Sequence, residues 1–157
     1  MDDNLGKNAT ELGKILLKNQ LFISFAESCT GGLLGSSLIS VPGSSKWVSQ
    51  GFVTYSNIAK IKFLGVNKQT LKEFGAVDTK VTDKMVKGVL KYDLADIAIA
   101  ISGVAGPTGG SKSKPVGTVC ISIGNNGEIL SKQHFFEGDR NHVRAQSAET
   151  ASKDPIN

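Results

Sequence analysis

Ser28 is the residue best placed in this sequence to do chemistry. It lies in the segment Glu27-Ser28-Cys29-Thr30-Gly31-Gly32, directly after the apolar run 21–26. An extended apolar run, a short polar turn and paired glycines before two leucines predict a strand, a tight loop and a helix N-terminus. Free backbone N–H groups at such a junction, with the positive end of the helix dipole, stabilise an alkoxide or oxyanion. Ser28 is therefore either a helix cap or a nucleophile.

A serine nucleophile needs a base to take its proton, and Lys60 is a candidate for that base. Lys60 falls within the first turn or so of a helix that Ser56 or Asn57 is expected to cap. The positive helix end and partial burial both favour a neutral amine. The alternative is that Lys60 is an ordinary surface lysine, as we expect of Lys62.

The sequence offers other reactive groups as well. We expect His134 to be a half-buried structural residue on a strand and His142 to lie on an exposed helix. No Gly-x-Ser-x-Gly segment supports a Ser-His-Asp triad. Cys29 is the main rival nucleophile, because a thiolate beside a helix N-terminus is more nucleophilic than a serine. The sequence leaves this rival open.

A second glycine-rich loop, residues 102–110, follows the apolar strand predicted at 95–101. Neither this loop nor the one after Ser28 carries a phosphate-binding Gly-Lys-Ser/Thr motif or a Gly-x-Gly-x-x-Gly fingerprint. Both loops are expected at the carboxyl ends of core strands, where open α/β sheets bind their ligands. Two such loops indicate a shared site, the alternative being that the glycines only make tight turns.

Helical and strand patterns alternate along the rest of the chain. We expect helices over about 10–20 (capped near Thr10), 31–39, 56–64, 69–74, 79–90 (capped by Thr79) and from about 141, and strands at 21–26, 47–55, 95–101, 117–123 and 128–136. The fold class is therefore α/β, a three-layer α/β/α sandwich around a mixed, mostly parallel sheet with a C-terminal antiparallel hairpin. Residues 1–157 form one domain on the usual size scale. The segment after about residue 145 lacks large apolar residues, so we expect it to fray.

Composition narrows the function classes. The net charge of +4 comes from scattered lysines, and arginine occurs only at Arg140 and Arg144, so extended nucleic-acid binding is not expected. The spacing of Cys29, Cys120 and the two histidines fits no metal site, and we predict neither a metal nor a cofactor. No apolar run approaches about 20 residues, and the acidic start at Met1 does not resemble a secretory signal. We therefore expect a cytoplasmic protein without membrane contact.

Seven segments in a fixed order carry a resemblance to a known family. They are Glu27–Gly32, Val41–Ser45, Gly51–Asn57, Gly75–Val77, Ile101–Pro107, Lys114–Val119 and Gly138–Arg140. From about Leu12 to Arg144 the chain resembles the C-terminal domain of the CinA family. The resemblance implies hydrolysis of the carboxamide of nicotinamide mononucleotide (NMN), within the pyridine nucleotide cycle, to nicotinic acid mononucleotide and ammonia. The mechanism that it implies is a serine–lysine one, and the assembly is a homodimer.

The resemblance assigns roles to single residues. Ser28 matches the nucleophile and Lys60 the base, while Tyr55 matches a catalytic position. Ser45, Ser102 and Arg140 match positions of the substrate site, and the N–H groups around Thr30, Gly31 and Gly32 are expected to hold the oxyanion. Arg140 suits a ribose phosphate, unless it forms a surface salt bridge with Asp139. Ser45 and Ser102 have the alternative of being turn or cap serines.

Another class of function stays open at this point. The same glycine loops would serve a non-catalytic module that binds a nucleotide or a protein partner, related to the competence and DNA-damage-inducible proteins. Such a module would bind NMN without releasing ammonia.

Overall fold

A five-stranded mixed sheet forms the centre of the molecule. The computed structural model describes residues 3–156, so Met1, Asp2 and the last residue of the predicted range 1–157 lie outside it. The strands are β1 (Ile23–Glu27), β2 (Val48–Val53), β3 (Ile97–Gly103), β4 (Thr118–Gly124) and β5 (Ile129–Phe135), in the order β2-β1-β3-β4-β5. β1 pairs in parallel with β2 and β3, whereas β4 is antiparallel to both β3 and β5. The predicted mixed sheet with a C-terminal hairpin is confirmed.

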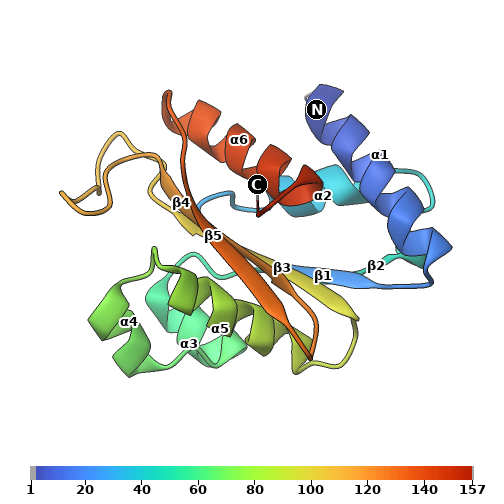
Figure 1. Cartoon of the computed structure of the whole chain (residues 1–157), viewed down its shortest axis with the longest axis horizontal. Coiled ribbons are helices and arrows are strands. Elements are labelled where there is room, and N and C mark those ends of the chain that lie inside the picture. Colours follow the sequence, from blue (N-terminus) through green and yellow to red (C-terminus); the bar gives the residue numbers. More distant parts are fainter. Residues whose placement is uncertain (1–2, 157) are drawn as a thin grey trace.

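Helices cover both faces of the sheet (Figure 1). One face carries α1 (Asp3–Lys18), α2 (Leu33–Ile39) and α6 (Arg140–Lys153), and the other carries α3 (Asn57–Leu64), α4 (Lys68–Phe74) and α5 (Thr79–Leu90). Ile99 and Ile101 of β3 point into the first apolar layer, while Ala98 and Ala100 point into the second. This alternation is the two-residue period of a strand buried on both faces, and it confirms the three-layer sandwich.

The C-terminal segment differs from its prediction. The chain is not frayed after residue 145, because α6 continues to Lys153 and buries Ala148, Ala151 and Ser152 among other small residues. Small side chains let α6 pack closely against α1 and α2 without large apolar residues. The buried Ser147 and Ser152 hydroxyls donate to carbonyls one turn back, which satisfies them inside the helix.

Two predicted helix starts were wrong. α1 begins at Asp3 instead of near Thr10, whose hydroxyl donates to the Gly6 carbonyl inside the helix. Before Thr10 this helix buries Leu5 and Ala9, and Leu5 is the one large apolar residue there, so the apolar pattern before Thr10 is weak. The cap of α5 is Asp78, whose carboxylate accepts the Lys80 N–H at 2.8 Å, and not Thr79.

Candidate active site

Ser28 and Lys60 lie against each other, as the sequence predicted. Ser28 directly follows β1, and its N–H donates to the Ile101 carbonyl, which extends the pairing with β3 by one residue. Strand alternation turns Ser28 toward the layer of α3, the same side as Ala26. Lys60 lies in the capped first half of α3, with Ser56 as the N-cap. The Lys60 Nζ is 2.9 Å from the Ser28 Oγ.

The Lys60 amine is buried among three oxygens. Only 1% of the residue is exposed, which excludes the surface-lysine alternative. Besides the Ser28 Oγ, its Nζ contacts the Thr54 carbonyl at 2.7 Å and the Tyr55 carbonyl at 3.2 Å. Burial lowers the pKa of Lys60 from 10.5 to about 8, against a small opposing effect of Cys29. No carboxylate within residues 3–156 forms an ion pair with it.

This set of partners suits a neutral amine as well as an ammonium. An ammonium donates to all three oxygens, whereas a neutral amine has two N–H bonds and one lone pair. The Thr54 and Tyr55 carbonyls only accept, so they take the two N–H bonds. The lone pair is then left for the Ser28 hydroxyl, the one partner that can donate, once this hydroxyl turns away from the Tyr55 carbonyl, to which it donates at 3.4 Å. The geometry therefore allows Lys60 to receive the Ser28 proton.

The loop after Ser28 is held differently from the expectation. The Glu27 carboxylate accepts the N–H groups of Leu34 at 2.9 Å and Gly35 at 3.0 Å, so the first turn of α2 is already occupied. Gly31 adopts φ 57° and donates its N–H to the Ser28 carbonyl. Within residues 3–156, the N–H groups of Thr30 and Gly32 have no hydrogen-bond acceptor. Of the three amides expected to hold an oxyanion, those of Thr30 and of Gly32, the N-cap of α2, therefore remain for it, while that of Gly31 does not.

The side chains of Tyr55 and Arg140 contact each other, and Arg140 also contacts the second glycine-rich loop. Arg140 donates to the Gly106 carbonyl at 2.7 Å and to the Tyr55 hydroxyl at 3.4 Å. Asp139 caps α6 and pairs with His142, so the alternative of an Arg140–Asp139 salt bridge was wrong. The part of Tyr55 that contacts Ser28 and Lys60 is its backbone carbonyl, while the residue is 64% exposed.

Ser102 and Ser45 lie at opposite ends of the sheet. Ser102 is buried and follows Ile101, whose carbonyl accepts the Ser28 N–H, so it lies next to Ser28. Ser45 is exposed in the short 3-10 turn Ser44–Lys46 before β2, beside the start of β1. Since β1 and β2 are parallel, the whole length of β2 separates Ser45 from Tyr55. Within one chain, Ser45 is not part of the Ser28 cluster.

The other reactive groups do not enter the cluster. Cys29 packs in the apolar layer on the far side of the sheet from Lys60, and burial raises the pKa of its thiol to about 11. Its Sγ is therefore a buried thiol and not an exposed thiolate. The ring of His134 contacts the Pro155 carbonyl at 2.7 Å, and the ring of His142 contacts the Asp139 carboxylate at 2.9 Å.

Arg144 also belongs to this region, although the sequence pattern predicted no role for it. It lies one helical turn after Arg140, and its guanidinium donates to the carbonyls of Cys29 at 2.9 Å and Thr30 at 3.0 Å. The scarcity of arginine and the i, i+4 spacing from Arg140 were the available signals. Both arginines of the chain therefore bind carbonyl groups of the two glycine-rich loops.

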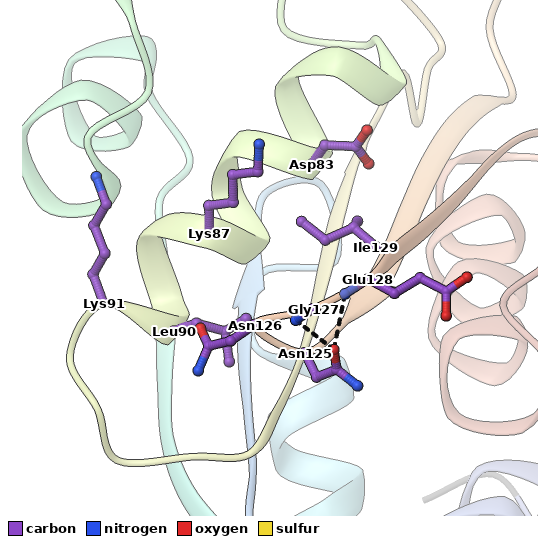
Figure 2. Close-up of a pocket in the computed structure, with 9 residues that line it drawn as sticks. All are labelled: Asp83, Lys87, Leu90, Lys91, Asn125, Asn126, Gly127, Glu128 and Ile129. Atoms are coloured by element: carbon purple, nitrogen blue, oxygen red, sulfur yellow. Dashed lines mark hydrogen bonds between the residues drawn. The ribbon is translucent and has the colours of Figure 1, made fainter.

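The cavity drawn in Figure 2 lies elsewhere. It has a volume of about 490 Å³ and is lined by the last turns of α5 and the hairpin between β4 and β5. That hairpin is at the opposite end of β4 from Gly103 and the second loop. Across residues 3–156, no three His, Cys, Asp or Glu residues gather as metal ligands do. No helix in the same range is both long and apolar enough to cross a bilayer.

Comparisons with known proteins agree on one family. The model of the CinA C-terminal domain matches residues 6–154. The nicotinamide-nucleotide amidohydrolase PncC of Enterobacter agglomerans is 45% identical over 148 residues, which covers 94% of this chain and 90% of the relative. A putative competence-damage inducible protein of Clostridioides difficile is 47% identical over 154 residues, and the chain spans 36% of its length.

Solved structures give the same result. The competence/damage inducible protein CihA of Agrobacterium tumefaciens superposes with a TM-score of 0.93 at 38% identity, covering 97% of this chain and 93% of that one. A CinA superfamily protein of Escherichia coli superposes with a TM-score of 0.91 at 35% identity, covering 97% and 90%. The chain belongs to the CinA C-terminal domain family.

Proposed function

We propose that this protein is an amidohydrolase that converts NMN to nicotinic acid mononucleotide and ammonia. The observation that carries the proposal is the buried Lys60 amine, 2.9 Å from the Ser28 Oγ, whose other two contacts are carbonyl oxygens. The likeness to a nicotinamide-nucleotide amidohydrolase over 94% of the chain supports the choice of substrate.

The proposed reaction begins with acylation of Ser28. Neutral Lys60 takes the Ser28 proton while the Oγ attacks the carboxamide carbon, and the carbonyl electrons move to oxygen. The Thr30 and Gly32 N–H groups hold this oxyanion. When the intermediate collapses, the C–N bond breaks and the Lys60 ammonium gives its proton to the departing nitrogen. Ammonia leaves, and a nicotinoyl ester remains on Ser28.

Deacylation repeats these steps with water. Lys60 removes a proton from the water as its oxygen attacks the ester carbon. The C–O bond to Ser28 then breaks, and Lys60 returns the proton to the Ser28 Oγ. The product carboxyl group releases the second proton of the water to solvent and leaves as a carboxylate, and Ser28 and Lys60 return to their starting state.

The remaining residues position the substrate in this proposal. Arg140 binds the ribose phosphate, since its planar fork matches phosphate oxygens and only part of it is engaged by Gly106 and Tyr55. Tyr55 acts through its carbonyl on Lys60, and its hydroxyl lies with Arg140 on the substrate side. Ser102 lines the floor beside Ser28. A homodimer would be needed before Ser45 of a second copy could approach the cluster.

An ammonia-release assay on NMN tests the proposal. The parent is expected to release ammonia, and Ser28→Ala and Lys60→Met are each expected to lower kcat by at least about 1,000-fold, because the nucleophile or its base is lost. Cys29→Ala is the matched control beside Ser28, and it should retain most of the activity. Activity that survives Ser28→Ala and disappears in Cys29→Ala would reject the assignment. NMN binding by the parent without ammonia release would favour the non-catalytic module.

A further inference from the structure

Arg144 binds two carbonyls of the loop after Ser28, and these contacts influence where the N–H groups of that loop point. Its Nε donates to the Cys29 carbonyl and its Nη2 to the next carbonyl, that of Thr30. The guanidinium lies so close to the loop that a Cβ built on Gly31 would be 3.5 Å from Nη2. For the Cys29 carbonyl, Arg144 is the one hydrogen-bond donor within residues 3–156.

Because a peptide group is planar, the direction of the Cys29 carbonyl also fixes the direction of the Thr30 N–H. The C=O and N–H of a trans peptide point in opposite directions. The peptide that ends in the Cys29 carbonyl carries the Thr30 N–H, and among residues 3–156 the cis peptide is at Gly106-Pro107. A carbonyl drawn toward Arg144 therefore directs the Thr30 N–H away from α6.

The layers of the fold show what lies in that direction. α6 and α3 cover opposite faces of the sheet (Figure 1), and α3 supplies Lys60. An N–H directed away from α6 is thus directed toward the layer that holds Lys60 and the Ser28 Oγ. Thr30 is fully buried, so its surroundings restrict how far this residue can move.

We propose that Arg144 is a positioning residue that holds the Cys29–Thr30 peptide with its N–H toward the oxyanion. This inference rests on the proposed function, whose oxyanion it serves. Arg144 does not touch the substrate in this account, so it acts on the rate of the chemical step and not on substrate binding. Without it, the peptide is free to rotate and the Thr30 N–H loses its direction.

Variants of Arg144 separate this role from a structural one. Arg144→Met keeps the length of the side chain and removes its donors, while Arg144→Lys keeps the charge but not the planar fork across two carbonyls. Gln146→Met is the matched control, because Gln146 also donates to two carbonyls from α6, those of Glu137 and His142, neither of which belongs to the loop after Ser28. Each variant is assayed for kcat, KM and thermal unfolding.

The expected result is a loss in kcat alone. Arg144→Met should lower kcat by about 100-fold, the usual effect of losing one oxyanion donor, with KM changed by less than about threefold. Arg144→Lys should lower kcat by about tenfold, a smaller loss than that of Arg144→Met. If Arg144→Met does not fold, Arg144→Lys is the variant that tests the proposal. A kcat equal to that of Gln146→Met, or a raised KM with an unchanged kcat, would overturn the proposal.

A second readout does not depend on NMN. An alkyl fluorophosphonate reacts with an activated serine when the Oγ displaces fluoride from phosphorus, and the charge that develops on the phosphoryl oxygen needs the same N–H groups. Mass spectrometry of the Ser28 peptide should show labelling that is about 100-fold slower in Arg144→Met than in the parent. Equal labelling rates, or a parent that is not labelled, would overturn the proposal. A parent that is labelled yet releases no ammonia from NMN would reject the proposed function alone.

Discussion

At the scale of single residues, the buried Glu27 carboxylate is central to the geometry of the loop that carries Ser28. It lies one residue before Ser28 and accepts the N–H groups of Leu34 and Gly35 at the start of α2. The positive end of a helix stabilises a negative charge, so the carboxylate needs no lysine or arginine partner there. Glu27 thus connects the end of β1 to the start of α2 and leaves the Lys60 amine without an ion pair.

This arrangement gives a prediction for Glu27→Gln. The amide nitrogen cannot accept a hydrogen bond, so one of the two N–H groups is left buried without a partner. The free energy of unfolding should fall by about 1–3 kcal/mol, measured by urea denaturation. Glu11→Gln is the control, since Glu11 forms only an exposed pair with Lys14 and should change stability by less than about 0.5 kcal/mol. Equal stability of the two variants would contradict the role of Glu27.

The sequence predicted the two central residues because their signals are local. Ser28 follows a strand and precedes paired glycines, and Lys60 follows a capping serine. Arg144, in contrast, binds carbonyls that are 115 and 114 residues away in the sequence and that only folding brings to it. A pattern read along the chain does not contain these contacts, which is why Arg144 received no role.

At the scale of elements, the close approach of α3 to α5 positions Lys60. Gly88 of α5 faces the C-terminal end of α3, and a Cβ built there would be 1.9 Å from the Leu64 carbonyl oxygen. Only glycine, which has no Cβ, allows the two helices to pack this closely. The same helix α3 carries Lys60 one turn earlier, so the depth of the amine depends on how closely α3 packs.

Gly88→Ala is therefore expected to push the two helices apart. Urea denaturation should show a loss of about 1–3 kcal/mol in the free energy of unfolding, the usual cost of overpacking. Gly6→Ala in α1 is the matched control, because a Cβ there meets nothing within 4 Å. Alanine has the higher helix propensity, so that variant should be stabilised by up to about 1 kcal/mol. A Gly88→Ala protein as stable as the parent would show that α3 can move without cost.

Element boundaries were predictable where caps and large apolar residues mark them, and less so elsewhere. The sequence predicted that Ser56 or Asn57 caps α3, and the structure has Ser56 as the cap. α6 was misjudged because its buried face consists of small residues and serines whose hydroxyls are satisfied within the helix. Their burial depends on the neighbouring α1 and α2, which the segment itself does not reveal.

At the scale of the whole molecule, the fold gathers the site at one edge of the sheet. Ser28, Thr54 and Ser102 follow or end parallel strands, and the arginines of α6 reach the loops between them. The order of parallel strands predicts this convergence, because their carboxyl ends meet at one edge. Ser45 and the cavity of Figure 2 lie at the other edge, so the chain by itself separates Ser45 from Ser28 and Lys60. The resemblance to the family placed Ser45 in the substrate site and did not reveal this separation.

Proton transfer from Ser28 to Lys60 is tested by titrating Lys60 and the activity together over the same pH range. Lys60 is titrated by carbon-13 NMR of its Cε, assigned with Lys60→Met, and kcat/KM for ammonia release from NMN is measured from about pH 6 to about pH 10. Burial disfavours the ammonium, so the neutral form should appear as the pH rises through about 8. Activity should increase about tenfold per pH unit below this value and level off above it. A Lys60 that stays protonated to about its ordinary pKa while activity is already maximal near neutral pH would contradict proton transfer from Ser28 to Lys60.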